Sequence, residues 1–216
     1  MHYSTAASDA LLVLACVASV IGILRSPRWH DKPWRATWLM AIAALLLTGA
    51  AAVVGVLHFG VDLSWQVLHA KLSQASSLLA LPILGVVALT LTRGWQWQRL
   101  GWCWVIISLS VLFEGAQRLG MLDTYKLLLN LATLGLVLYA GGSSGRNPLL
   151  VAVGVVALFI VAGLVIGTQG VIGPLQRVDV FHALLSLAYP LLTWLLLGLN
   201  GRNGVTAQTE KSVKTL

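Results

Sequence analysis

The sequence predicts an all-α polytopic membrane protein that forms a single bundle of seven transmembrane helices. Hydrophobic residues make up 58% of its 216 residues and charged residues only 10%, whereas about a quarter of a soluble domain is charged. The mean hydropathy is +0.86. Seven stretches approach the roughly 20 apolar residues that a helical span needs. The connections between them are short, so the chain has no room for a soluble domain.

The seven expected spans are about 9–25, 36–57, 72–92, 100–117, 122–141, 147–168 and 179–199. The first is interpreted as a retained helix, because its basic residues follow it and a signal peptide has them in front. The second and sixth are rich in glycine and alanine, which let membrane helices approach closely. Pro82 and Pro190 predict kinks in the third and seventh. Residues 200–216 are expected to form a disordered basic tail.

The basic residues predict an orientation with the N-terminus outside and the C-terminus inside. Ten of them flank the connections and the tail expected on one face: Arg25, Arg28, Lys32, Arg35, Arg93, Arg99, Arg146, Arg202, Lys211 and Lys214. Only Lys71, Arg118, Lys126 and Arg177 fall on the other. Cytoplasmic connections carry such an excess of lysine and arginine. The net charge of +7 is thus interpreted as an orientation signal, not as nucleic-acid binding. Membrane lipids are the expected partners, and a bacterial inner membrane is the expected location.

Histidines and acids gather at the predicted outer ends of the helices. His58 ends the second span, His69 begins the third, and Asp179 and His182 begin the seventh. Asp179 and His182 are three residues apart and so share a helix face. Asp9, Asp62, Glu114 and Asp123 also fall on the outer side. The positive-inside rule does not account for this gathering, which favours a shared polar site facing the outside.

This pattern is compatible with a zinc site. Three neutral imidazoles and a water form a typical catalytic zinc shell, and a carboxylate often orients one of the ligands. His58, His69 and His182 are the candidate metal ligands, with Asp179 as a fourth ligand or a support. Zinc would lower the pKa of its water toward ~7. Glu114 or Asp62 would then act as the acid or base.

Simpler interpretations stay open for the same residues. Each histidine alone is typical of an interfacial side chain that faces water. Glu114 and Arg118 are four residues apart and can form an ion pair on the helix surface. Serines 73, 76 and 77 are candidate nucleophiles, although such serines more often support helix packing.

The layout resembles the CREST superfamily of seven-helix membrane hydrolases, which includes the alkaline ceramidases and the progestin/adipoQ receptors. His58 in GVLHFG matches the family's histidine at the end of helix two, and His182 matches the second histidine of its helix-seven pair. His69 stands where the family has an aspartate, and Val54 and Val178 replace its serine and its other histidine. DVFHALL also resembles the DxxH segment of a poorly characterised group of bacterial and fungal membrane proteins. The resemblance implies a zinc-dependent hydrolase acting on a lipid amide or ester.

Three functions are therefore carried forward from the sequence. The first is the metal-dependent lipid hydrolase with its site at the outer face. The second is a binding or sensing protein that uses the same pocket without chemistry, since imidazoles in water titrate near ~6.5. The third is a b-type haem protein with His58 and His182 as axial ligands.

Overall fold

The computed structural model describes residues 3–173 and 175–199, and over these the chain is almost entirely helical. Seven helices in this part are long and apolar enough to cross a membrane. The expected all-α class is thus confirmed, and the protein is best described as an integral membrane protein. The expected tail at 200–216 lies outside the described residues.

The helices are α1 (Tyr3–Arg25), α2 (Arg35–Gly60), α3 (Gln66–Ala75), α4 (Leu81–Arg93), α5 (Arg99–Arg118), α6 (Leu122–Ser144), α7 (Arg146–Ile160) and α8 (Arg177–Gly198). Short 3-10 turns occur at η1 (Pro27–His30), η2 (Lys32–Trp34) and η3 (Leu63–Trp65), and π-helical segments at η4 (Ser76–Ala80) and η5 (Val161–Ile166). A two-stranded antiparallel hairpin, β1 (Val171–Ile172) and β2 (Leu175–Gln176), precedes α8.

Several helices extend beyond the apolar runs that predict them. The third spanning segment covers Leu63–Arg93 and the second covers Lys32–Gly60. His69 therefore lies inside a helix, about two turns from its start. Hydropathy marks only the part of a helix that is apolar throughout. It does not mark a polar first turn, which continues the same hydrogen-bonded helix.

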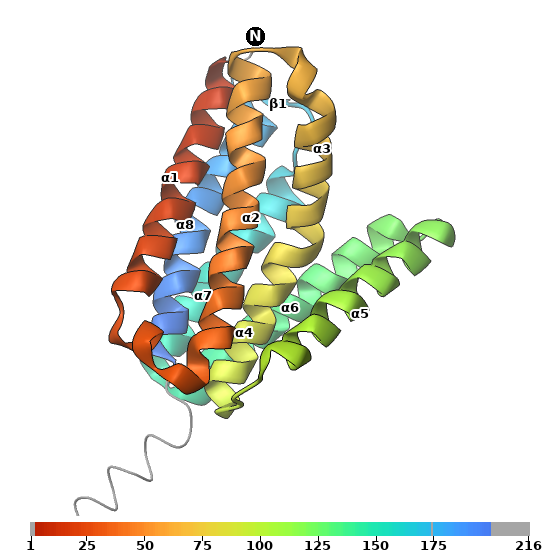
Figure 1. Ribbon diagram of the computed structural model, residues 1–216. Coiled ribbons are helices and arrows are strands. Elements are labelled where there is room, and N and C mark those ends of the chain that lie inside the picture. The colour runs from red at the N-terminus through yellow and green to blue at the C-terminus, as the bar shows by residue number, and fades with distance from the viewer. Residues whose placement is uncertain (1–2, 174, 200–216) are drawn as a thin grey trace, which may run out of the picture.

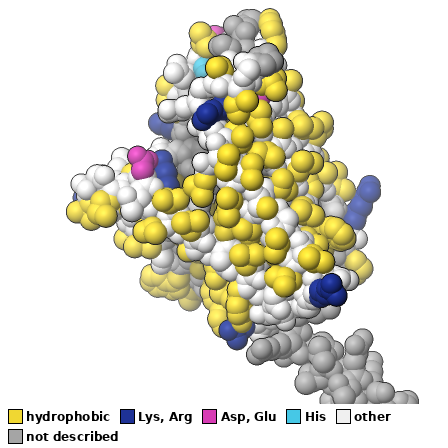
Figure 2. All heavy atoms as spheres, turned by 180° about the vertical axis from the view of Figure 1, so that it is seen from behind, with side chains coloured by type: hydrophobic (Ala, Val, Ile, Leu, Met, Phe, Trp, Pro, Cys, Tyr) yellow, Lys and Arg dark blue, Asp and Glu magenta, His cyan; other side chains and the backbone are white. Residues whose placement is uncertain are grey.

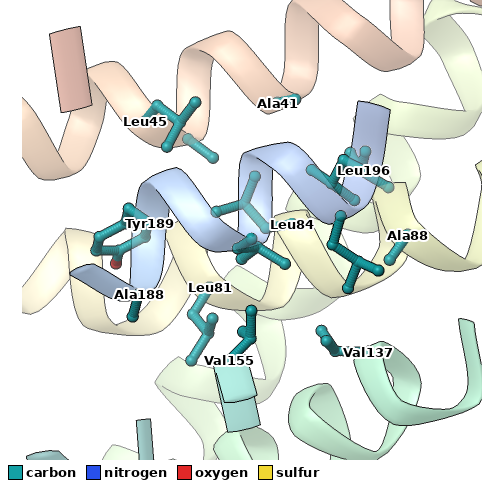
Figure 3. Packing of buried hydrophobic residues seen from close by; sticks show 14 of the residues in the cluster. Ala41, Leu45, Leu81, Leu84, Ala88, Val137, Val155, Ala188, Tyr189 and Leu196 are labelled. Carbon is teal, nitrogen blue, oxygen red and sulfur yellow. The ribbon is translucent and has the colours of Figure 1, made fainter. Parts of the chain in front are cut away.

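The helices pack around a core made by α1, α2, α4, α6, α7 and α8. The first helix contacts both α2 and α8, and α7 contacts α6 and α8. Leu45, Leu84, Val155 and Leu196 meet in this core, as Figure 3 shows, and all four are essentially inaccessible. Small residues such as Ala188 between them allow the close approach of the helices.

Pro82 and Pro190 have different effects on the helices that contain them. The π-helical segment η4 ends just before Pro82, which stands at the start of α4. Proline lacks a backbone donor and crowds the carbonyl four residues earlier, so a wider turn there relieves the conflict. Pro190, by contrast, lies inside α8, which continues to Gly198 as one helix.

The fifth helix is attached to the rest by little of its surface. Trp102 is its only buried residue, and two leucines, an isoleucine, a valine and a tryptophan on it are exposed. In Figure 1, α5 and α6 lean away from the bundle toward the end where α1 begins. Figure 2 shows a broad hydrophobic surface over the rear face with most basic side chains near its margins, which fits a surrounding membrane.

Candidate functional site

A carboxylate–imidazole pair joins the first and last helices near the end where both begin. The Nδ1 atom of His182 in α8 lies 2.9 Å from Oδ1 of Asp9 in α1. Asp9 is 1% exposed. A buried carboxylate is costly unless it is paired. The pairing therefore fixes both side chains and directs the proton of Nδ1 toward Asp9, so that Nε2 is the nitrogen left for other contacts.

His69 from the third spanning segment adds a second imidazole to this site. Its Nδ1 lies 3.3 Å from the backbone oxygen of Ala51 in α2. Its ring stacks on His58 with the ring centroids 5.7 Å apart. Phe59 meets the His69 ring edge-on at 5.5 Å. We call Asp9, His58, His69 and His182 the polar cluster.

Gly55 in α2 makes room for the polar cluster. A Cβ atom at this position would lie 2.2 Å from Oδ2 of Asp9 and 3.1 Å from Cε1 of His69. No side chain larger than hydrogen fits there without displacing the carboxylate. The same distances show that the side chains of Asp9 and His69 both lie against the backbone of α2 at Gly55. Gly55 thus brings elements from α1, α2 and α3 to one point.

A cavity of about 360 Å³ runs from the polar cluster into the bundle. Asp9, His69 and His182 line one part of it, together with Phe181. Thr48, Ser76 and Tyr189 line another part and hydrogen-bond among themselves, with Oγ1 of Thr48 3.0 Å from Oγ of Ser76 and 3.4 Å from the Tyr189 hydroxyl. Most of the remaining wall is apolar, as in typical small-molecule sites.

The cavity reaches the side of the bundle between α6 and η5. Leu127 and Leu131 of α6 and Leu164 of η5 line it, and they are 43%, 42% and 58% exposed. These exposed leucines form an apolar opening on the flank of helices that are long and apolar enough to cross a membrane.

Not all of the sequence-predicted metal ligands reach the cavity. His69 and His182 line it, whereas His58 lies behind His69 and Asp179 lies outside its lining. Asp179 is 7% exposed, and neither of its oxygens has a hydrogen-bond partner among the described residues. The Nδ1 atom of His58 lacks one as well. Buried polar atoms of this kind usually contact water or an ion, or carry a proton.

The two sequence-predicted acid–base candidates lie away from the cavity. Asp62 is exposed and caps a short turn, accepting hydrogen bonds from the hydroxyl and the backbone N–H of Ser64. The Ser64 hydroxyl bond is the main cause of a lowered pKa for Asp62, which makes it a weaker base. Glu114 forms an exposed ion pair with Arg118 at 2.7 Å, as the alternative interpretation of the sequence anticipated.

The donor atoms match a zinc site only in part. In metal sites the ligating histidine usually gives its other ring nitrogen to a carboxylate or a backbone carbonyl. His182 and His69 both show this arrangement, with Asp9 and Ala51 as the respective partners. However, no group of three or more His, Cys, Asp or Glu side chains among the described residues is placed to share one ion. The arrangement thus falls short of the three-ligand shell, and zinc stays a prediction.

Asp9 is the candidate site residue that sequence reasoning missed. It appears in the sequence as one acid among several near the outer edge. The available signal was its position, because it is the only acid in the first apolar run and stands seven residues from Cys16 and fifteen from Leu24. Its partner is 173 residues away in the chain, so no local pattern could have joined them.

Comparisons with known proteins return no match among family models, curated proteins or solved structures. The resemblance to the CREST superfamily therefore stays a prediction that rests on the residues quoted for it, and the geometry of the cavity carries the functional argument.

Proposed function

We propose that this protein is an integral membrane hydrolase that cleaves an ester or amide bond of a lipid-like molecule, with the Asp9–His182 pair as its general base. The observation that carries the proposal is this buried hydrogen-bonded pair on the wall of a largely apolar cavity. An imidazole oriented by a carboxylate is the most common general base in proteins.

The shape of the cavity supports a substrate that has both an apolar tail and a polar bond. Exposed leucines line its lateral entrance, and the polar cluster occupies another part of its wall. A tail lying along the leucines would place a carbonyl group within reach of His182. The tail stays in an apolar environment throughout, so entry from the membrane has little desolvation cost.

The chemistry that we propose balances without an added reactant other than water. Nε2 of His182 takes a proton from a water molecule while the water oxygen forms a bond to the carbonyl carbon. Asp9 stabilises the resulting imidazolium through Nδ1–H. The carbon–oxygen or carbon–nitrogen bond then breaks, and His182 returns the proton to the leaving alcohol or amine. His69 is the neighbouring polar side chain available to hydrogen-bond the substrate.

The decisive experiment is a turnover assay of purified protein in detergent with fluorogenic lipid esters and amides. We expect hydrolysis by the wild type and a fall of about 10²–10⁴-fold in His182→Gln, the range that general-base catalysis contributes. Glu114→Gln serves as the matched control, because it also removes an acid–base candidate but lies outside the cavity. Equal losses in both variants, or no turnover of any substrate by folded wild type, would contradict the proposal.

Metal analysis of the same samples tests the zinc prediction separately. About one equivalent of zinc that is lost in both His69→Gln and His182→Gln would show a two-histidine metal site with ligands beyond those described. An absorption spectrum of the same preparation tests the haem alternative. Turnover by protein that contains no bound metal would support the mechanism in which the Asp9–His182 pair is the general base.

We further propose that the polar cluster faces the outside of a bacterial inner membrane, as the excess of basic residues at the opposite end supports. Labelling of single cysteines in intact cells tests this orientation. In a Cys16→Ser, Cys103→Ser background, Asp62→Cys should react with a membrane-impermeant maleimide, whereas Asp31→Cys should not. The reverse labelling would invert the orientation.

A second candidate function is ligand sensing without chemistry. The cavity of about 360 Å³ favours it, because a largely apolar cavity with a few polar groups in its wall can hold a small molecule whether or not a reaction follows. Saturable binding of a lipid-like molecule with no turnover would support this function over the hydrolase.

A further inference from the structure

Basic side chains gather at the end of the bundle opposite the polar cluster. Three of them already have partners. Arg28 donates to the backbone oxygen of Leu199, Arg35 lies over the ring of Trp29 at 5.8 Å, and Arg93 lies over the ring of Tyr139 at 5.0 Å. Lys32 and Arg99, by contrast, are exposed at this end and form no ion pair among the described residues.

Lys32 and Arg99 line one surface hollow although they come from different connections. The hollow also includes Gln96, Gln98 and the indole of Trp97. No acidic side chain lines it among the described residues, and neither cation forms an ion pair within that part of the chain. Two cations and two amides around one concave surface form a site for an anion.

A second hollow continues from the first along α5. The two hollows share Gln96, Trp97 and Gln98, and the second is lined further by Gly101, Trp104, Val105, Ser108 and Leu109. These positions recur every three or four residues and so lie on one face of the helix. From Gly101 to Leu109 the groove advances about 12 Å along the helix axis, long enough to accept part of an acyl chain.

The packing of α5 explains why this groove stays open. Its start is held by Trp102, which is buried and meets the ring of Trp97 edge-on at 5.5 Å, while Trp95 stacks on the other side of Trp97 at 6.0 Å. Beyond Trp102 no residue of α5 is buried, and the helix leans away from α4 (Figure 1). The tryptophans thus fix the hollow beside the cations, and the groove next to it runs along residues of α5 that are not buried.

We propose that this continuous surface binds an anionic phospholipid from the surrounding membrane. Its phosphate lies between Lys32 and Arg99, and one acyl chain lies along α5 against Trp104 and Leu109. Basic pockets between membrane helices recognise anionic headgroups in this manner. The binding site is separate from the polar cluster, so the proposal does not depend on the hydrolase function.

The experiment measures lipid retention by native mass spectrometry of the full chain in detergent. Dioleoylphosphatidylglycerol or dioleoylphosphatidylcholine is added at matched concentrations. We expect the wild type to retain the anionic lipid preferentially. Each basic residue near an anionic lipid contributes about 1 kcal/mol, which is roughly fivefold in affinity. The double variant Lys32→Gln/Arg99→Gln should therefore bind on the order of thirtyfold more weakly.

Matched variants separate this site from general charge attraction. Arg25→Gln/Arg146→Gln removes two exposed cations that lie outside both hollows, and it should retain the lipid as the wild type does. Ser108→Trp fills the groove and should weaken retention, whereas Ser110→Trp on the exposed surface of α5 outside the groove should not. These three variants change only exposed positions, so their folding should be preserved.

Three results would overturn the proposal. One is equal retention of the two lipids by the wild type. Another is equal loss in the two double variants, which would show only a diffuse attraction to the basic end. The third is displacement of the lipid by millimolar glycerol phosphate, which would show a site for a free phosphate compound instead of a membrane lipid.

Discussion

The two ends of the bundle hold their ionisable side chains in opposite ways. At one end Asp9 is almost fully buried and hydrogen-bonded to His182. At the other, Lys32 and Arg99 are exposed beside tryptophans. A buried charge needs a partner inside the protein. The contact between the two fixes the positions of both side chains closely enough for a reaction. An exposed lysine or arginine keeps its charged group at the interface on a flexible stem, which suits recognition by charge.

The same contrast holds between whole helices. The first and last helices pack side by side and carry the buried pair, whereas α5 buries only Trp102. A helix that packs on two neighbours can position a side chain for a reaction. A helix that packs on few neighbours has only its exposed surface with which to bind another molecule. The following substitutions test this difference, from the largest expected effect to the smallest.

Replacing the buried acid should have the largest effect. Asp9→Asn preserves the shape but removes the charge that stabilises the imidazolium of His182, so we expect turnover to fall about 10²–10⁴-fold. Asp31→Asn is the comparison at the opposite end, where the acid is exposed, and it should leave turnover unchanged. Initial rates on the same lipid ester measure both. Full activity in Asp9→Asn would show that the pair is structural.

Gly55→Ala should disturb the polar cluster by crowding it. The new methyl group would overlap Oδ2 of Asp9, and overpacking of this kind costs about 1–3 kcal/mol. Turnover should fall together with stability, because the carboxylate must move.

Gly115→Ala in α5 is the control, since a Cβ there meets nothing within 4 Å and alanine favours helices. Denaturant unfolding in detergent compares the two variants. A Gly55→Ala protein as stable and active as Gly115→Ala would show that Asp9 is free to relocate.

Tyr189→Phe should have a moderate effect on stability. It removes a buried hydroxyl that accepts a hydrogen bond from Thr48, and a typical bond of this kind contributes about 1 kcal/mol. Thr48 keeps its contact with Ser76, so the loss should not exceed that value. Tyr139→Phe is the comparison near the basic end, because phenylalanine preserves the ring under Arg93. The same unfolding assay should show almost no change for it, and an equal loss in both would contradict the assignment.

Glu114→Gln should have the smallest effect. Both side chains of the Glu114–Arg118 pair are largely exposed, and exposed pairs four residues apart on a helix contribute about 0.3–0.5 kcal/mol, further screened by salt. A double-mutant cycle with Arg118→Gln measures the coupling. A coupling well above 1 kcal/mol would show that this end of α5 is covered by protein in the assembled state.

Sequence reasoning located the helices and the general position of the site. Apolar runs near 20 residues reveal a membrane helix because its backbone must satisfy its own hydrogen bonds in hydrocarbon. His69 and His182, singled out from their places at helix ends, line the same cavity. Asp62 and Glu114 share the same outer position along the sequence but point to the surface. The position of a residue along its helix follows from the sequence, whereas the direction in which its side chain points does not.

The sequence by itself thus determined the all-α class, the seven long apolar helices and the separation of histidines and acids from most of the basic residues. Only the tertiary structure decided that Asp9 is the partner of His182, that Gly55 leaves space for it, and that α5 leans away from the bundle. The physical reason is that hydropathy is a local property of each segment. The pairing of two side chains 173 residues apart depends instead on which helices pack together and how each is rotated about its axis, and these are properties of the whole bundle.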